Sequence, residues 1–434
     1  AESVPYKASY CCSFMDEDAC MFEDATVLKD DAKRKCRVHG QNCELPDRVD
    51  AFGAGFSCTS YSMLNKNASE NATAMTKSVN QDPSGNVASV TTFHGCLDVL
   101  DECSPVWAVF ENVESIDREV DDDTQTNLEL CLAAIADRGY ASQSFLLDAL
   151  WFGLPQSRRR VYIVCLSIRD RNVGCSAEDF LSNVQSIITK LYLQSPPAEP
   201  LSALDCSAFW LLLVGPPRFI PLLVPSEDKF LLPDTHALVK GHLRSLEADR
   251  QQRLAKEQEQ DTSKAHPKNP SWMALHMNVA EKRGITWPLN VCKQVKESPW
   301  FRVLTERAQE VVGFASDERE RLGKPVDYAD VYHSASRYST GRGNFPIVLP
   351  RTIGWTFLRQ RLVLGRELMM FQGHSVSADC DLTEAQLGNM AGNAFAGNVV
   401  IAVVTAVLGS LRFVSESEDE ETNSILDLVN TVTG

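Results

Sequence analysis

Two stretches in the first third of the chain carry side chains that could do chemistry at the end of an apolar run. Cys58 stands on a glycine-containing loop after the apolar residues 49–55, and Glu111 and Asn112 follow the apolar residues 106–110. Ligands of open α/β sheets bind at the carboxyl ends of the strands. A thiol there can act as a nucleophile, and a carboxylate as an acid or a hydrogen-bond partner. Taken singly, such a cysteine is more often structural, and a lone glutamate is more often a helix cap or a surface acid.

A third stretch places polar and basic side chains at alternating positions. Gln156, Arg158 and Arg160 point to one side if this segment is extended. A pair of guanidinium groups can hold a planar group that bears oxygen, and it favours the ionised form of a nearby thiol. A basic strand edge taken alone is usually solvated surface. These residues therefore indicate a functional site only in combination with the first two stretches.

The elements that must position these residues alternate between strands and helices. Leu128 to Ile135 has helical apolar spacing, and Gly139 follows as a stop signal. Strands separated by helical segments predict an α/β domain with a largely parallel sheet. The strands are expected at residues 49–55, 106–110, 145–150 and 161–166.

The remaining sequence predicts a second region and a return to the first. The pattern loosens after residue 168, a charged helix is expected at 243–259, and an apolar helix at 394–411. We expect four regions. They are a catalytic α/β domain (1–168), a variable region (169–345), C-terminal motifs that return to the catalytic domain (346–412) and an acidic tail (413–434).

Composition argues against some partners and leaves others open. The 434 residues carry a net charge of −16, which counts against a nucleic-acid partner. Residues 331–366, however, contain no acidic residue, and a basic face on an acidic body can still bind phosphate. This face could equally be ordinary arginine-rich surface. Its arginines are Arg337, Arg342, Arg351, Arg359, Arg361 and Arg366.

The cysteines and the apolar runs indicate neither a metal site nor a membrane segment. The 14 cysteines include no Cys-x-x-Cys pair, so we expect scattered, reduced thiols and no bound metal. The longest apolar run, residues 209–224, is interrupted by prolines and an arginine. The chain begins with Ala1 and shows no secretory signal, which predicts a segment of a longer polypeptide.

Taken in order, the three stretches resemble the cytosine-C5 methyltransferase family, whose signature is a Pro-Cys loop, then Glu-Asn-Val, then Gln-x-Arg-x-Arg. Two later stretches fit the same family. Arg366-Glu367 with Gln372-Gly373 resembles its Arg-Glu…Gln-Gly element, and Gly392-Asn393 resembles its closing Gly-Asn element. The resemblance covers residues 14–170 and 345–412. It implies a Rossmann-like, S-adenosylmethionine-dependent methyltransferase sheet, with a variable target-recognition lobe inserted before the C-terminal motifs.

The resemblance also implies roles for individual residues. The Cys58 thiolate would add to C6 of cytosine and so activate C5, while Glu111 would bind the N3 and amino edge. Arg160 would hold the base's O2, and Arg158 would support the thiolate and its loop. Gln156 and Asn112 are expected to orient the substrate. Arg337 and Arg342 are expected to contact phosphate groups of the nucleic acid. The cofactor contacts are expected at Asp24, Ser57 and Asn393. The base must leave the duplex, because C5 is inaccessible there.

The sequence departs from the family in three places. Ser57 stands where proline is usual, which would leave the loop freer, and Thr59 stands where glutamine is usual. The glycine loop Phe-x-Gly-x-Gly, which cradles the methionine part of the cofactor in the family, has no counterpart before residue 24 or after residue 412. We therefore expect either an amino-terminally truncated enzyme region, whose activity alone is doubtful, or a chain that has lost cofactor binding.

Three functions follow from these observations. The first is a DNA methyltransferase catalytic region, which the long unmatched middle segment favours and which implies residence in the nucleus. The second keeps the chemistry but makes RNA, such as transfer RNA, the target. The third is a non-catalytic relative that binds nucleic acid or a protein. The missing glycine loop favours the third function, whereas the presence of Cys58, Glu111, Arg158 and Arg160 argues against it.

Overall fold

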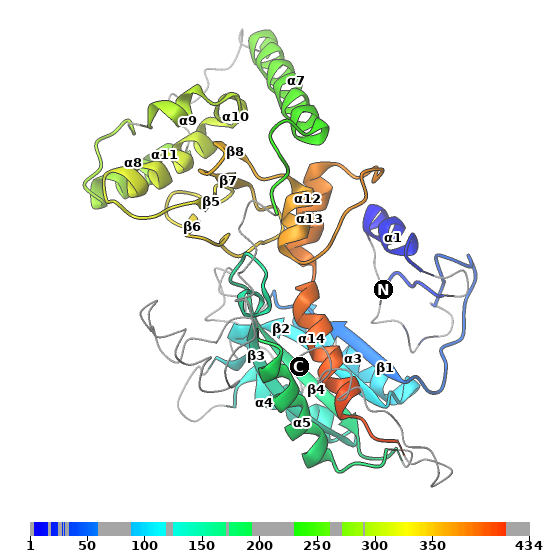
Figure 1. Cartoon of the computed structure of the whole chain (residues 1–434). Coiled ribbons are helices and arrows are strands. Elements are labelled where there is room, and N and C mark those ends of the chain that lie inside the picture. The colour runs from blue at the N-terminus through cyan, green and yellow to red at the C-terminus, as the bar shows by residue number, and fades with distance from the viewer. Residues whose placement is uncertain are drawn as a thin grey trace. The chain divides into compact units, whose positions relative to one another are not determined.

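The computed structural model of the chain consists of two compact units, each of which is described by itself (Figure 1). Unit 1 comprises residues 1–148, 159–192 and 399–434, and unit 2 comprises 149–158 and 193–398. The structure describes residues 4–15, 19–24, 28, 30, 34–59, 88–118, 125–170, 173–192, 230–260, 271–289 and 291–413. The predicted acidic tail lies outside the described residues from 414 onward.

A four-stranded sheet forms the centre of unit 1 and confirms the expected α/β class. Its order is β1 (Ala51–Gly55), β2 (Trp107–Val113), β4 (Arg159–Ser167), β3 (Tyr140–Asp148). Strands β1 and β2 are parallel, and helix α3 (Ala88–Cys103) precedes β2 along the chain. The expected strands at 49–55, 106–110 and 161–166 are present within a few residues, whereas the third strand begins earlier than expected.

The prediction of a largely parallel sheet was wrong for these strands. Strand β4 is antiparallel to both β2 and β3. Between β3 and β4 only residues 149–158 intervene, including the short 3₁₀ helix η4 (Ala149–Phe152). A parallel crossover needs a dozen or more residues, usually with an α-helix, so this short connection requires an antiparallel pair.

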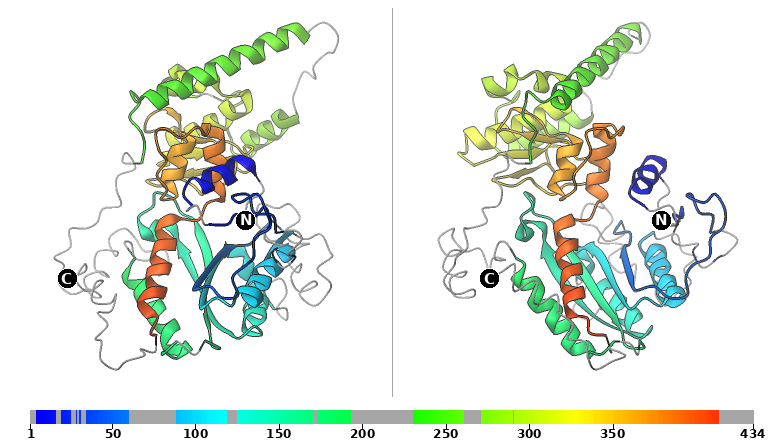
Figure 2. Two further views of the ribbon diagram at one scale, coloured as in Figure 1. Left: turned by 90° about the vertical axis from the view of Figure 1, so that its right-hand side faces the viewer. Right: turned by 45° about the vertical axis from the view of Figure 1, so that its right-hand side comes forward.

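Helices cover both faces of the unit 1 sheet. Helices α3 and α4 (Asn127–Ala136) pack on one face, where Phe93, Leu97 and Ile135 join a continuous apolar cluster with the strands. Helices α5 (Ala177–Lys190) and α14 (Gly397–Ser410) lie on the other face from α3 (Figure 2). Helix α4 starts at a capping box, in which Thr126 and Glu129 satisfy each other's main-chain N–H groups.

Two short elements complete unit 1. Helix α1 (Pro5–Cys12) begins with proline at its first position, where the missing N–H costs nothing. The 3₁₀ helix η3 (Glu114–Asp117) follows β2 directly. Between α1 and β1 the chain forms isolated bridges, Phe22 with Cys36 and Lys35 with Asn42, instead of regular strands.

Unit 2 combines helices with a small antiparallel sheet of order β6-β5-β7-β8. The predicted charged helix is present as α7. The helices are α7 (Ala237–Gln260), α8 (Ser271–Lys282), α9 (Lys293–Glu297), α10 (Pro299–Val303), α11 (Glu306–Glu320), α12 (Gly365–Phe371) and α13 (Glu384–Asn393). The strands are β5 (Tyr328–Asp330), β6 (Ser339–Gly341), β7 (Gly354–Thr356) and β8 (Arg361–Leu362). Helix α11 lines the core of this unit with Val311 and Val312.

The division into units differs from the predicted regions. Helix α5, which we placed in the variable region, belongs to unit 1, because its Phe180, Val184 and Ile188 are buried and the helix packs on β3 and β4. Residues 346–398, which we expected to return to the catalytic domain, belong to unit 2. Of that region, only the part from residue 399 onward rejoins unit 1.

The apolar segment near the end of the described chain is a pair of helices. Among the described residues, Glu384–Ser410 is the one stretch long and apolar enough to cross a membrane by length and composition, and half of its most apolar window is buried. Residues 394–396 separate it into α13 and α14. Helix α14 buries Val399, Val403 and Val407, as the core helix of a folded unit does.

A buried ion pair fixes the centre of unit 2. The two terminal nitrogens of Arg361 donate to the two carboxylate oxygens of Glu367 at 2.9 and 2.8 Å, and both side chains are at most 1% exposed. Glu367 also accepts from the main-chain N–H groups of Leu364 and Leu232. Because every lone-pair direction of this carboxylate is used, the pair offsets much of its desolvation cost.

We predict that Glu367→Ala destabilises unit 2 by about 3–5 kcal/mol, because it removes the buried counter-charge of Arg361 and leaves only the exposed Asp234 carboxylate as its acidic partner. Tryptophan fluorescence during urea unfolding measures this, since Trp300 and Trp355 are buried in the same unit. The control is Glu297→Ala, which removes the exposed pair with Lys293 at 3.6 Å and should cost under about 1 kcal/mol. Equal effects of the two substitutions would contradict the role of the buried pair.

Candidate active site

The register of the unit 1 sheet brings the predicted nucleophile and carboxylate to one edge. In the parallel pair, Gly55 at the end of β1 lies opposite Glu111 on β2. Cys58 follows the end of β1 by three residues. On the other side of β2, Val113 lies opposite Arg160 at the start of β4. The loop of Cys58, the carboxylate and this guanidinium therefore belong to three adjacent strands at the same edge of the sheet.

An ion pair joins two of these groups directly. Nε of Arg160 lies 3.1 Å from Oε1 of Glu111, and the side chains are only 11% and 15% exposed. Arg160 also donates from Nη1 to the carbonyl of Arg159 at 2.8 Å. One residue earlier, at the start of β4, Arg159 pairs with Glu114 at the same 3.1 Å, but both of these side chains are 48% exposed. The Glu111 pair is thus the one shielded from solvent, where charge interactions are stronger.

Hydrogen bonds hold the loop of Cys58 against its neighbours. Nδ2 of Asn112 donates to the carbonyl of Phe56 at 3.0 Å, and Asn112 is 2% exposed. The main-chain N–H of Ser57 donates to Oγ1 of Thr92 on α3 at 2.9 Å, and Oγ of Ser57 lies 3.1 Å from Oγ1 of Thr59. Proline has no N–H and could not bond to Thr92. The serine that we expected to free the loop therefore attaches it to α3 instead.

Other described cysteines of unit 1 are poor candidates for the nucleophile. Burial raises the pKa of Cys96 to about 12 and also raises the pKa of Cys131 and Cys165. A thiol must ionise to attack, so these three groups are inert near neutral pH. Cys58 is only partly buried, and its loop leaves β1 at the sheet edge that also carries Glu111 and Arg160.

Two of the predicted site residues have structural contacts inside unit 2. Gln156 has no exposed surface, and its amide donates to the carbonyl of Phe371 and to Oε1 of Gln372, both at 2.8 Å. Arg158 is 5% exposed and donates to the carbonyls of Val348 at 2.7 Å and Ala394 at 3.1 Å.

We expected Gln156, Arg158 and Arg160 to point to one side of an extended segment. That prediction is wrong for Gln156 and Arg158. Only Arg160 lies on a strand of unit 1, since the chain passes from unit 2 to unit 1 between residues 158 and 159. A side chain without exposed surface cannot touch a base in this arrangement. We therefore assign Gln156 a positioning role instead of the expected substrate contact.

The predicted cofactor residues are divided between the two units. Asp24 is exposed and Ser57 is half-buried, both in unit 1. Asn393 is an exposed residue of unit 2, and its amide donates to the carbonyl of Asn389 at 2.9 Å. In the sheet order, no described strand flanks β1 on the side away from β2. Among the described residues, Asp24 and Ser57 of unit 1 are therefore the expected cofactor contacts that lie in the same unit as Cys58.

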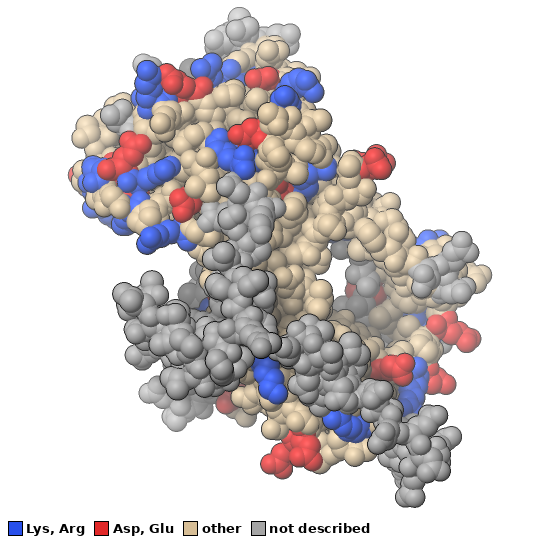
Figure 3. Space-filling view, in the orientation of Figure 1, with Lys and Arg blue, Asp and Glu red and all other residues tan. Residues whose placement is uncertain are grey.

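The expected basic face is smaller than the sequence indicated. Arg361 and Arg366 are 1% and 6% exposed and pair with Glu367 and Glu384, so they cannot contact phosphate. Arg337, Arg342 and Arg351 remain exposed. On the face drawn in Figure 3, basic and acidic groups are interspersed, without one continuous basic patch.

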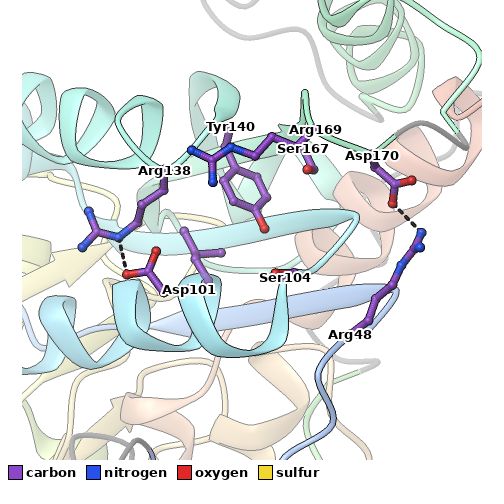
Figure 4. A pocket seen from close by; sticks show the side chains of 9 residues that line it. Arg48, Asp101, Ser104, Arg138, Tyr140, Ser167, Arg169 and Asp170 are labelled. Atoms are coloured by element: carbon purple, nitrogen blue, oxygen red, sulfur yellow. Dashed lines mark hydrogen bonds and ion pairs between the residues drawn. The ribbon is translucent and has the colours of Figure 1, made fainter.

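A polar pocket lies at the opposite edge of the unit 1 sheet (Figure 4). Tyr140 at the start of β3 and Ser167 at the end of β4 line it, together with the ion pair of Arg138 and Asp101 at 3.0 Å. Burial raises the pKa of Tyr140 to about 12, and its hydroxyl donates to the carbonyl of Pro105. None of its lining residues is a cysteine or a histidine, and this edge is remote from Glu111 along β2. We therefore place the active site at the Cys58 edge.

The sequence analysis missed a second group of reactive side chains in unit 1. Cys20, Cys36, His39 and Cys43 place their sulfur and nitrogen atoms within 4.8 Å of one another. The signal was available as a Cys-x-x-His step at 36–39, with Cys43 soon after it. The gap of fifteen residues after Cys20 concealed the fourth member.

Comparisons with known protein families and curated proteins agree on one family. Residues 19–201 match the family model described as C-5 cytosine-specific DNA methylase. The orphan methyltransferase M.Rho11sI of Bacillus phage rho11s is 29% identical over 100 residues. That alignment spans 23% of this chain and 17% of the phage protein. This chain therefore aligns with well under two thirds of that relative's length.

Solved structures give more distant likenesses. The S. pombe Dnmt2 methyltransferase aligns with a TM-score of 0.33 and 14% identity, covering 83% of this chain and 77% of its own. A putative DNA modification methyltransferase encoded within a prophage of E. coli aligns with a TM-score of 0.36 and 13% identity, covering 84% and 79%.

We predict that Cys58 reacts with iodoacetamide at pH ~8, whereas Cys96, Cys131 and Cys165 do not. A thiol whose pKa is raised to about 12 stays protonated at that pH, with roughly one group in 10⁴ ionised. Peptide mass spectrometry of the folded chain after brief alkylation measures the difference, with urea-unfolded protein as the control. If Cys58 reacted as slowly as Cys165, the assignment of an accessible thiol at this edge would fail.

Proposed function

We propose that this chain, whose residues 19–201 match the C-5 cytosine-specific DNA methylase family model, methylates C5 of cytosine in DNA through a covalent bond to Cys58. The observation that supports this most strongly is the shared sheet edge. The Cys58 loop, Glu111 and Arg160 lie on three adjacent strands, and the carboxylate and guanidinium are already paired at 3.1 Å. No other edge of the described unit 1 sheet combines a partly exposed thiol with such a pair.

The thiol supplies the activation that cytosine needs. C5 of cytosine is a poor nucleophile, so Sγ of Cys58 first adds as a thiolate to C6. The electron pair of the C5–C6 double bond then moves to C5, which can take an electrophile. Loss of the C5 hydrogen as a proton and departure of the sulfur from C6 restore the ring and release the enzyme. The hydrogen bonds of Asn112 and Ser57 position the loop that carries the thiol.

The paired carboxylate and guanidinium suit adjacent polar groups on one edge of the pyrimidine. Glu111 accepts from the amino group and from a protonated N3, which stabilises the charge that develops as the thiolate adds. Arg160 donates to O2. Their mutual pairing orients both groups before the base arrives. The base must leave the duplex to reach them, at a cost of roughly a few kcal/mol for unstacking.

S-adenosylmethionine is the methyl donor that the family implies, and when bound it would supply an electrophilic methyl group. The residues expected to hold it are divided between the units, with Asp24 and Ser57 in unit 1 and Asn393 in unit 2, and the steps above involve only the chain's own thiol, carboxylate and guanidinium. These steps can be tested without the donor. In its absence, C5 of the adduct takes a solvent proton, and loss of the original hydrogen gives exchange at C5.

DNA is the target that we favour. The family description names DNA, and unit 2 offers a lobe with exposed Arg337 and Arg342 that could contact a duplex. Residence in the nucleus would follow from this substrate. RNA is the runner-up target, because the chemistry at the base is the same.

Tritium exchange tests this proposal. The full chain, incubated with duplex DNA carrying [5-³H]cytosine and no methyl donor, should release tritium to water, and Cys58→Ser should abolish the release. Cys96→Ser is the control thiol, because its burial excludes it from the reaction. Release from RNA alone would make RNA the target, and release from neither nucleic acid would refute the enzyme.

We predict that Glu111→Gln lowers the exchange rate at least about 100-fold, the usual scale for loss of a positioned group that stabilises developing charge, while DNA affinity changes less than about 3-fold. The matched control is Glu114→Gln, which removes the exposed partner of Arg159 on the same strand edge. Exchange rates and fluorescence-anisotropy titrations supply the two readouts. Parallel losses of exchange and affinity in Glu111→Gln would show that the carboxylate acts in binding alone.

We predict that added salt weakens DNA binding, because exposed arginines of unit 2 contact the phosphates. The buried arginines of unit 2 should not contribute to this salt dependence. Replacing both Arg337 and Arg342 with alanine should reduce the slope of log K against log salt by about 1.8. Arg250→Ala, an exposed arginine on α7, is the control. Titrations at several salt concentrations measure the slopes, and an unchanged slope in the double variant would remove these two residues from the interface.

A further inference from the structure

Four side chains that the proposed chemistry does not use meet ahead of β1. The group is Cys20, Cys36, His39 and Cys43, which we name the Cys₃His cluster. Nδ1 of His39 lies 3.5 Å from Sγ of Cys20, 3.5 Å from Sγ of Cys36 and 3.3 Å from Sγ of Cys43. All four atoms lie within 4.8 Å of one another, so they surround one point.

These separations match the edges of a metal-centred tetrahedron. With zinc–sulfur bonds of ~2.3 Å and zinc–nitrogen bonds of ~2.1 Å, the sulfur–nitrogen edges would measure roughly 3.6 Å. The observed edges of 3.3–3.5 Å need only small adjustment to accept the ion. A disulfide would instead require two sulfurs in covalent contact, and each of these three cysteines is a free thiol.

The local backbone is built to present these ligands. Residues 35–42 form a tight turn, closed by a bridge between Lys35 and Asn42 and by a bond from the Gly40 N–H to the Cys36 carbonyl at 2.9 Å. Gly40 adopts a positive φ of 70°, which a residue with a side chain rarely takes. This turn places Cys36 and His39 on the same side, with Cys43 just beyond it.

Main-chain N–H groups also surround the buried sulfur. The N–H of Met21 donates to Sγ of Cys36 at 3.4 Å, and those of Val38 and His39 point to the same atom. Cys36 has no exposed surface, whereas His39 is exposed and Cys43 is partly exposed. Amide donors around a metal-binding sulfur orient it and stabilise its thiolate. The open side gives an ion a path of entry.

We propose that Cys20, Cys36, His39 and Cys43 bind one Zn²⁺ ion through three thiolates and the imidazole Nδ1. This ligand set is typical of structural zinc, because soft sulfur and imidazole ligands suit that ion. Four protein ligands close the coordination sphere and leave no position for a substrate. The proposal replaces our expectation, drawn from the sequence, that the chain binds no metal.

The ion would fasten two segments that have little apolar core of their own. Residues 19–24 and 34–43 contain only two buried side chains, Met21 and Cys36. Short segments with so little core need a metal or a disulfide to fold stably. The zinc would therefore hold the segment carrying Asp24 to the turn that leads into β1. This role is independent of the cytosine chemistry.

Metal analysis of the purified full chain tests the proposal. We expect about one zinc per chain after gel filtration, and a loss of at least about 10-fold in zinc content for Cys43→Ser and for His39→Ala, as expected when one of four ligands is removed. The control is Cys11→Ser, an exposed cysteine of α1 outside the cluster. Cobalt substituted for zinc should show the visible absorption of a tetrahedral thiolate site.

A second measurement on the unaltered chain guards against variants that misfold. Cys20 and Cys43 should resist maleimide until a chelator removes the metal, while Cys11 reacts throughout. Absence of bound metal, iron or copper in place of zinc, or equal zinc loss in Cys11→Ser would each overturn the proposal. Failure of cytosine exchange with zinc still bound would leave this site standing and refute only the proposed activity.

Discussion

The parallel pairing of β1 with β2 is the constraint on which the site depends. It sets Gly55 opposite Glu111, so that a loop leaving one strand and a carboxylate ending the next reach the same edge. A register shift of one residue would turn Glu111 to the other face of the sheet, because side chains alternate. The antiparallel pairing of β2 with β4 then adds Arg160 from the third strand. The proposed site thus depends on main-chain hydrogen bonds between strands, which set the positions of all three side chains.

Arginines in this protein have two separate uses, which sequence alone does not distinguish. Arg158 and Arg361 are almost fully buried and bond to carbonyl groups, with Glu367 as an additional partner of Arg361. They hold unit 2 together. Arg160 is also largely buried, but its partner is a carboxylate at the open edge of the unit 1 sheet. Only its position on β4 separates the guanidinium that we propose binds the base from a structural one two residues earlier.

Much of the fold could be predicted from local patterns. Apolar runs ending at Gly55 and Phe110, and helical spacing before Gly139, located β1, β2 and α4 within a few residues. Patterns of this kind carry no information on strand direction. The antiparallel placement of β4 depends on the short connection from 149 to 158, whose consequence we missed. The prediction of a basic face was wrong at Arg361 and Arg366 for a similar reason. These arginines are buried in ion pairs with Glu367 and Glu384, and a run of charged residues in a sequence does not reveal which of them are buried.

The site itself was visible mainly through motif order. Cys58, Glu111 and Arg160 carry little information alone, and their shared edge depends on pairings between residues far apart in the sequence, Gly55 with Glu111 and Val113 with Arg160. The Cys₃His cluster was missed because Cys20 is separated from Cys36 by residues that carry no metal signature. The hydrogen bonds of Asn112 with Phe56 and of Ser57 with Thr92 could not be predicted from the sequence either. Each joins residues that only the folded backbone brings together.

The central claim is that the sulfur of Cys58 reaches a cytosine ring held by Glu111 and Arg160. Duplex DNA carrying 5-azacytosine tests it most directly, because the ring nitrogen at position 5 makes C6 more electrophilic and no methyl donor is needed for the adduct. Peptide mapping by mass spectrometry then identifies the modified residue. The account predicts a single adduct on the peptide containing Cys58. An adduct on another cysteine, or none on DNA or on the equivalent RNA, would contradict it.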